Sequence, residues 1–109
     1  MPFKRLLPGL LALLLPAPAW AADISGADIA RNGAPSGAPA CVACHGETLQ
    51  GNPALKSPAI AGLTADYILQ RLEHYASPEG HNALMKQVAT TLTPDEKRAV
   101  AAYLATLKR

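Results

Sequence analysis

The sequence predicts an all-α fold of about four short helices within a single domain. Three observations support this fold class. Apolar residues recur at intervals of three and four along the C-terminal half of the chain, which is the period of a helix packed on a core. Side chains that cap helices stand before these periodic segments. The segments between them are rich in glycine and proline and lack the alternating pattern of a half-buried strand.

Residues 1–21 have the three regions of a secretory signal peptide. Two basic side chains stand near the start, an apolar run covers residues 6–15, and a small-x-small pattern ends at Ala21. The apolar run is about half as long as a bilayer span and is bounded by prolines. We predict cleavage after Ala21, a mature domain over residues 22–109, and export to the periplasm without stable membrane insertion.

Removal of the signal peptide changes the charge balance. The full chain has ten Lys and Arg residues against eight Asp and Glu, which is a formal net charge of +2. Lys4 and Arg5 leave with the signal peptide, so the mature chain has eight basic and eight acidic residues and no net charge. No basic face remains that would favour nucleic acid as a partner.

The first predicted helix covers residues 26–32. Ser25 or Asp23 can cap its first turn, and Ile29 and Ala30 supply its apolar contacts. A helix of this length is not stable in isolation. It must therefore dock on another element of the fold.

Residues Cys41 to His45 form a Cys-x-x-Cys-His motif. A porphyrin carries two vinyl groups on neighbouring pyrroles, and two cysteines separated by two residues can reach both and form thioethers. The residue after the second cysteine then lies under the iron. We therefore predict that Cys41 and Cys44 anchor one haem c per chain, and that His45 is the fifth iron ligand.

Three other roles for this cysteine pair fit the sequence less well. A thioredoxin-like redox pair requires a strand-to-helix context, and nothing before Cys41 resembles a strand. A structural zinc site needs two further ligands at suitable spacing, whereas only His74 and His81 remain, both single and far downstream. A disulfide between Cys41 and Cys44 would close a very short loop.

The segment over residues 46–62 has no helical or alternating period, so we predict an extended loop that passes over one face of the haem. Pro58 lies within it. The carbonyl of such a residue can accept the second ring N–H of a ligating histidine and fix its tautomer. The sequence is equally consistent with a Pro58 that only stiffens the loop.

A second helix is predicted over residues 65–76, after the capping residue Thr64. Its apolar face consists of Ile68, Leu72 and Tyr75, at positions i, i+4 and i+7. His74 lies beside this face, and we predict an ordinary surface histidine there.

A glycine turn leads into a third predicted helix over residues 83–91, with Leu84, Val88 and Leu92 facing inward. Met85 is the only methionine of the mature chain, and its thioether is the natural sixth ligand for an iron that has a histidine on the other side. Two alternatives remain at this stage. Met85 fills the core, as most methionines do, or His81 takes the sixth position and the haem has two histidine ligands.

The last predicted helix begins at Pro94, with a capping box from Thr93 to Glu96. Its apolar stripe consists of Val100, Tyr103, Leu104 and Leu107. We expect Tyr103 to pack across the small Gly26 of the first helix. This contact would join the two ends of the mature domain.

These motifs resemble those of the small monohaem class I cytochromes c of bacteria, such as cytochrome c-553, and of each half of the periplasmic dihaem cytochromes. The resemblance covers essentially the whole mature chain. The matching segments are Cys41–Gly46, 58–62, 67–70, 80–85 and 101–104. The resemblance implies a class I cytochrome c fold around one haem, with His45 and Met85 as the axial pair and the Pro58 carbonyl as the partner of His45.

The resemblance also implies a function as a periplasmic carrier of single electrons and not as an enzyme. Its partners would be redox proteins in transient contact: a reductase or dehydrogenase as donor, and an oxidase or another cytochrome as acceptor. One alternative is a haem subunit of a periplasmic dehydrogenase or sulfur-oxidising complex. Another is a haem sensor or enzyme, which requires a displaceable sixth ligand.

Overall fold

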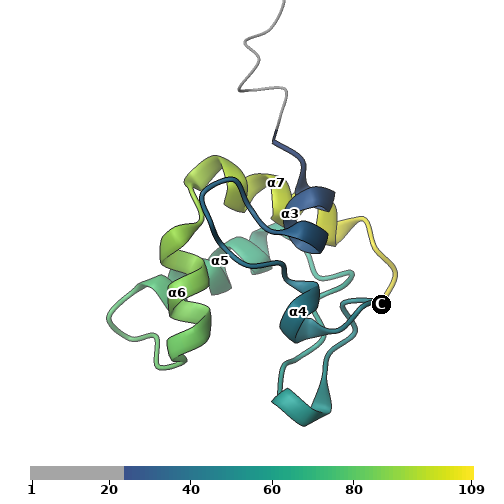
Figure 1. Cartoon of the computed structure of the whole chain (residues 1–109), viewed down its shortest axis with the longest axis horizontal. Helices are drawn as coiled ribbons and strands as arrows, with labels where there is room; N and C mark the ends of the chain where they lie inside the picture. The colour runs from purple at the N-terminus through teal and green to yellow at the C-terminus, as the bar shows by residue number, and fades with distance from the viewer. Residues whose placement is uncertain (1–23) are drawn as a thin grey trace, which may run out of the picture.

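The computed structural model describes residues 24–109. The predicted signal peptide and its cleavage site lie outside the described residues. The described part folds into five α-helices and one short 3-10 helix, without a named β-strand, which confirms the all-α prediction (Figure 1). The elements are α3 (Gly26–Asn32), α4 (Val42–His45), η2 (Pro53–Leu55), α5 (Ala65–Ala76), α6 (Ala83–Thr91) and α7 (Pro94–Ala105). No helix within residues 24–109 is long and apolar enough to cross a bilayer.

The four longer helices begin at side-chain caps, which explains why local sequence predicted their starts. The Ser25 hydroxyl oxygen accepts a hydrogen bond from the Asp28 N–H (3.2 Å), and the Thr64 oxygen accepts one from the Tyr67 N–H (3.2 Å). The α7 helix has the complete capping box that the sequence predicts. Each cap satisfies an N–H that has no partner within its helix.

The α3 and α7 helices cross at Gly26, next to Tyr103, as the sequence predicts (Figure 1). A Cβ atom on Gly26 would lie 2.7 Å from the Cβ of Tyr103 and even closer to the carbonyl oxygen of Ala99. The α7 helix also packs on α5, and α5 packs on α6. The two ends of the domain are thus joined through α7.

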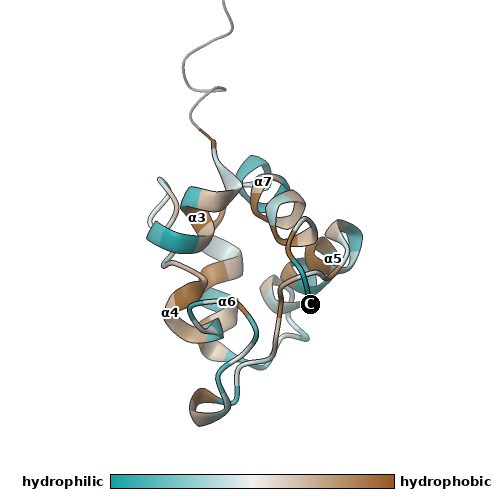
Figure 2. Cartoon of the chain, turned by 90° about the vertical axis from the view of Figure 1, so that its right-hand side faces the viewer, coloured by the Kyte–Doolittle hydropathy of each residue, from teal (hydrophilic) through white to brown (hydrophobic). Residues whose placement is uncertain are grey.

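The apolar core of the described part is thin. Its buried hydrophobic residues are Ile29, Ala30, Ala38, Leu49, Ala61, Ile68, Leu72, Ala89, Leu92, Val100, Ala101 and Leu104. Five of these are alanines, whose methyl groups bury little surface. Figure 2 shows further apolar segments on α4, α5 and α7. A domain of this length usually buries a larger apolar surface. Further apolar surface, such as that of a bound cofactor, would make up the difference.

One prediction about the third helix is wrong. Leu84 is 69% exposed, whereas the sequence predicts that it faces inward. The inward side of α6 is instead the stripe of Met85, Ala89 and Leu92, at positions i, i+4 and i+7. Because successive helical residues are about 100° apart, Leu84 projects away from this stripe.

Glu96 is a buried carboxylate, 4% exposed, that connects α7 to the loop before the cysteine motif. It accepts hydrogen bonds from the Ser36 N–H (3.1 Å), the Ser36 hydroxyl and the Thr93 N–H (2.9 Å). Burial raises the pKa of Glu96, but the hydrogen bonds from Ser36 and Thr93 outweigh it and lower this pKa below its ordinary value of 4.5. The carboxylate is thus the stable form in the folded protein.

We expect Glu96→Gln to lower the free energy of unfolding by roughly 1.5–3 kcal/mol at pH 7, because the amide turns an N–H₂ group toward a donor and removes the charge from these hydrogen bonds. The matched control is Glu73→Gln. Glu73 is 70% exposed and, within residues 24–109, its one ion pair is with Lys97, so its change is expected to be below about 1 kcal/mol. Guanidinium unfolding of both variants measures the difference.

The lowered pKa of Glu96 predicts that the stability of the protein depends on pH. Because the folded-state pKa of Glu96 lies below its unfolded value, its stabilisation is complete above pH 4.5 and is lost as pH falls through the folded-state pKa. The unfolding free energy of the wild type is therefore expected to fall more steeply below pH 4.5 than that of Glu96→Gln. Parallel curves for the two proteins would contradict this assignment.

Candidate haem site

The cysteine motif lies on α4, a single helical turn that the sequence analysis did not predict. The His45 N–H donates to the Cys41 carbonyl (2.9 Å), which closes the turn and places Cys41 and Cys44 on the same side, three residues apart. A helix of four residues is unstable alone, but α4 packs on α3. The docked α3 helix thereby positions the motif.

The His45 ring is buried and oriented by one hydrogen bond. The side chain is 8% exposed, and its Nδ1 lies 2.8 Å from the carbonyl oxygen of Pro58. Since a carbonyl only accepts, Nδ1 carries the proton, and Nε2 keeps its lone pair for a metal. The contact between His45 and Pro58 is therefore present as expected, and iron ligation by His45 stays a prediction.

The loop that carries Pro58 is held by a residue that the sequence analysis missed. Leu49 is fully buried at a φ of +62°, and its carbonyl accepts hydrogen bonds from the N–H groups of Ile60 (2.9 Å) and Ala61 (3.0 Å). The Gly51 N–H donates to the His45 carbonyl (2.8 Å). Leu49 is the only apolar residue among positions 46–52, and this was the available signal.

The loop over residues 46–62 is more regular than predicted. It contains η2 and one isolated antiparallel bridge between Asn52 and Ser57. The Asn52 N–H donates to the Ser57 carbonyl (2.9 Å), and the Ser57 N–H donates to the Asn52 carbonyl (3.1 Å). Asn52 also caps η2 through its side chain. These hydrogen bonds bring Asn52 and Ser57 together, immediately before Pro58.

Both thiols of the motif are free and half-buried. The pKa of Cys41 is raised to about 11, mainly by burial; a backbone hydrogen bond partly opposes this rise, and the nearby Cys44 makes a smaller contribution to it. Cys41 is therefore protonated at neutral pH in the chain without haem, and it is a poor nucleophile toward oxidants. Among residues 24–109, no group of three or more His, Cys, Asp and Glu side chains is placed to hold a metal ion, as the zinc alternative would require.

Met85 lies in the first turn of α6. The side-chain oxygen of Asn82 caps this helix by accepting a hydrogen bond from the Met85 N–H (2.9 Å). The Met85 side chain is half-buried and packs against the apolar core, on the inward stripe of α6. His81 and His74 are both exposed.

The chemistry of these residues fits a covalently bound haem. The motif supplies two thiols on one helical turn, and His45 supplies an imidazole whose tautomer leaves Nε2 available. Met85 supplies a soft thioether from the inward side of another helix. Five of the buried apolar residues are alanines, which bury little surface, and a porphyrin would add a large apolar surface to this core.

Comparison with known families gives a match over most of the chain. The family model for cytochrome c matches residues 30–108. This range contains every residue that the sequence analysis assigns to the site.

Individual relatives agree with this family. The thiosulfate dehydrogenase electron acceptor of Thiomonas intermedia is 38% identical over 89 residues, which cover 82% of this chain and 39% of the relative. The cytochrome c4 structure of Acidithiobacillus ferrooxidans is 36% identical with a TM-score of 0.68, over 75% of this chain and 47% of that one. The thiosulfate dehydrogenase structure of Marichromatium purpuratum is 31% identical with a TM-score of 0.72, over 76% of this chain and 18% of that one. The chain thus spans less than half the length of these relatives.

Proposed function

This chain belongs to the cytochrome c family, with covalently bound haem c as its cofactor, and on this premise we propose that it carries single electrons between redox proteins in the periplasm. The observation that carries the proposal is the His45 ring, held at Nδ1 by the Pro58 carbonyl with Nε2 free to bind iron. A carrier needs a rigid ligand of this kind, because movement of a ligand between oxidation states slows electron transfer.

Each site residue has a role in this proposal. Cys41 and Cys44 would hold the haem by thioether bonds, His45 and Met85 would bind its iron, and Pro58 orients His45 through its carbonyl. The bound haem supplies a one-electron couple. The chain would orient the haem and shield it from water, and the thioether of Met85 would favour the reduced metal. With both His45 and Met85 bound to the iron, no position would be open to a substrate, so we propose that the protein acts as a carrier and not as an enzyme.

The remaining parts of the proposal concern export. We assign residues 1–21 as a signal peptide that is removed after Ala21, and residues 22–109 as the cytochrome c domain. Haem attachment then takes place outside the cytoplasm, where a free Cys-x-x-Cys pair would otherwise be oxidised. The protein would work in the periplasm without stable insertion in a membrane.

A second candidate function is the electron acceptor of a periplasmic thiosulfate dehydrogenase. The names of two curated relatives, from Thiomonas intermedia and Stutzerimonas stutzeri, favour it, at 38% and 39% identity. The haem site would be the same in both functions. Stable co-purification with a larger dehydrogenase would favour the subunit, whereas a free carrier would make only small transient contacts with its donor and acceptor.

Met85→Ala tests the axial pair. In the oxidised wild type we expect the weak absorption band at about 695 nm that marks methionine–iron ligation, hereafter the methionine band. Met85→Ala is expected to keep its covalent haem, to lose the methionine band completely, and to bind carbon monoxide when reduced. Absorption spectra of protein expressed with c-type maturation measure all three.

The matched control is Leu84→Ala, on the preceding residue of α6. Leu84 is 69% exposed, so this variant is expected to keep the wild-type spectrum. A wild type with covalent haem but no methionine band would contradict Met85 as a ligand. If His81→Ala then opened the sixth position to carbon monoxide, His81 would be that ligand.

A further inference from the structure

The segment between α5 and α6, residues 77–82, leads to Met85 in the first turn of α6. Several hydrogen bonds fix its conformation. The Ser77 hydroxyl donates to the His74 carbonyl (2.7 Å), and the Gly80 N–H donates to the Ser77 carbonyl (3.0 Å). A Cβ atom on Gly80 would lie 2.8 Å from the Cα of Tyr75, so the segment passes directly over the end of α5. The segment is therefore a tight connection whose shape depends on the Ser77 carbonyl.

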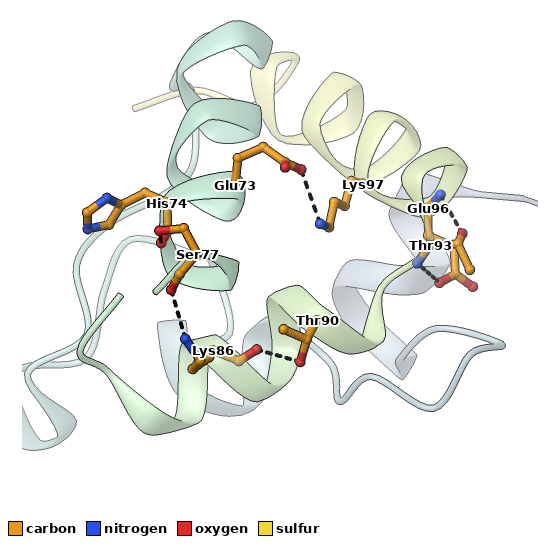
Figure 3. A network of polar contacts seen from close by, with 8 residues as sticks. All are labelled: Glu73, His74, Ser77, Lys86, Thr90, Thr93, Glu96 and Lys97. Atoms are coloured by element: carbon orange, nitrogen blue, oxygen red, sulfur yellow. Dashed lines mark hydrogen bonds and ion pairs between the residues drawn. The ribbon is translucent and has the colours of Figure 1, made fainter. Parts of the chain in front are cut away.

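Lys86 closes this connection from the other side. Its ammonium group Nζ donates a hydrogen bond to the Ser77 carbonyl (2.8 Å), across the end of α5 (Figure 3). The Lys86 N–H donates to the Asn82 carbonyl (2.8 Å), in the first turn of α6. One residue thus links the C-terminus of α5 to the N-terminus of α6, next to Met85 in the chain.

The Lys86 contact differs from an ordinary surface lysine interaction. Lysine is among the residues most often left exposed, yet Lys86 is half-buried. Its partner is the carbonyl at the C-terminal end of a helix, where the helix dipole favours a positive charge. A hydrogen bond from a charged donor to such a carbonyl is stronger than one between neutral groups.

We propose that Lys86 is a positioning residue that holds Met85 in register for the iron. The inference rests on the proposed function, in which Met85 is the sixth ligand. Methionine is a neutral ligand on a side chain with three rotatable bonds, so its bond to iron depends on the position of its backbone. With Lys86 bonded to Ser77, α6 cannot move away from the end of α5 without breaking a charge-assisted hydrogen bond.

The test uses Lys86→Gln, whose shorter neutral side chain cannot reproduce the bond to Ser77. We expect its methionine band to disappear on heating well below the temperature at which helical circular dichroism is lost. We also expect the reduced variant to bind carbon monoxide at least ten-fold faster than the wild type. Lys86→Arg, which can still donate to the Ser77 carbonyl, is expected to restore both properties.

Lys97→Gln is the matched control. Lys97 is also a shielded lysine, and it bonds to Glu73 between α5 and α7, away from the Met85 connection (Figure 3). It is expected to keep the wild-type methionine band and carbon monoxide kinetics up to global unfolding. The same loss in Lys97→Gln as in Lys86→Gln would show general destabilisation and overturn the proposal.

The outcomes also separate this inference from the proposed function. A wild type without the methionine band would refute Met85 as the ligand and the positioning role with it. A wild type with the band, together with a Lys86→Gln variant that keeps both the band and slow carbon monoxide binding, would overturn the role of Lys86 alone.

Discussion

Replacing Cys41 and Cys44 together by serine is expected to abolish covalent haem attachment and, with it, most of the folded population. Serine oxygen does not form the thioether bonds that hold the porphyrin. The buried apolar residues include five alanines, so the chain by itself buries too little surface to offset its conformational entropy. We expect a loss comparable to the whole stability of a small domain, about 5 kcal/mol or more.

Two measurements check this result. Haem staining after denaturing electrophoresis reports covalent attachment, and far-ultraviolet circular dichroism reports helix content. The control is the wild-type chain expressed without haem maturation, which keeps both thiols and is expected to be as unfolded as the double variant. A well-folded chain without haem would show that the alanine-rich core suffices and would contradict the expectation.

Gly26→Ala is expected to destabilise the protein by about 1–3 kcal/mol, although it replaces glycine by the best helix former. The new Cβ atom would lie 2.7 Å from the Cβ of Tyr103 and still closer to the Ala99 carbonyl oxygen. The carbonyl oxygen and carbonyl carbon of Ala99 belong to the α7 backbone, so no side-chain rotation relieves the contact. The α3 helix must therefore move away from α7.

The sign of the change in the free energy of unfolding of Gly26→Ala tests whether α3 and α7 approach each other closely at this residue. On helix propensity alone, alanine in place of a helical glycine stabilises by about 0.4–1 kcal/mol. Ala102→Gly, on the exposed side of α7, calibrates this propensity within the same protein and is expected to destabilise by about 0.5–1 kcal/mol. Denaturant unfolding of the haem-loaded proteins measures both variants, and a stabilised Gly26→Ala would contradict the close approach of the two helices.

The starts of the longer helices were predictable because their signals are local. A cap and the residues that follow it lie within one turn, as at Ser25, Thr64 and Thr93, so their hydrogen bonds require no other part of the fold. The Cys-x-x-Cys-His motif is local in the same way. The contact of Gly26 with Tyr103 was expected because Tyr103 lies on the apolar stripe of the last helix and Gly26 is a small residue of the first helix on which it can pack.

Other features depend on residues far apart in the chain, and local patterns do not report them. The α4 helix exists because it docks on α3, and Leu49 adopts a left-handed conformation because its carbonyl binds the loop that returns with Pro58. The exposure of Leu84 depends on which stripe of α6 meets α5. A helical period defines several possible faces, and only packing selects one.

The haem motif, the four longer helices and the caps at Ser25, Thr64 and Thr93 could be predicted from the sequence alone, because each depends on a few neighbouring residues. The long-range hydrogen bonds could be seen only in the folded chain: Glu96 accepts from Ser36, 60 positions away, and Lys86 donates to Ser77 across the connection between two helices. Such bonds form between groups that are far apart in the unfolded chain. Bringing these groups together costs conformational entropy, and the packing of the whole domain offsets this cost.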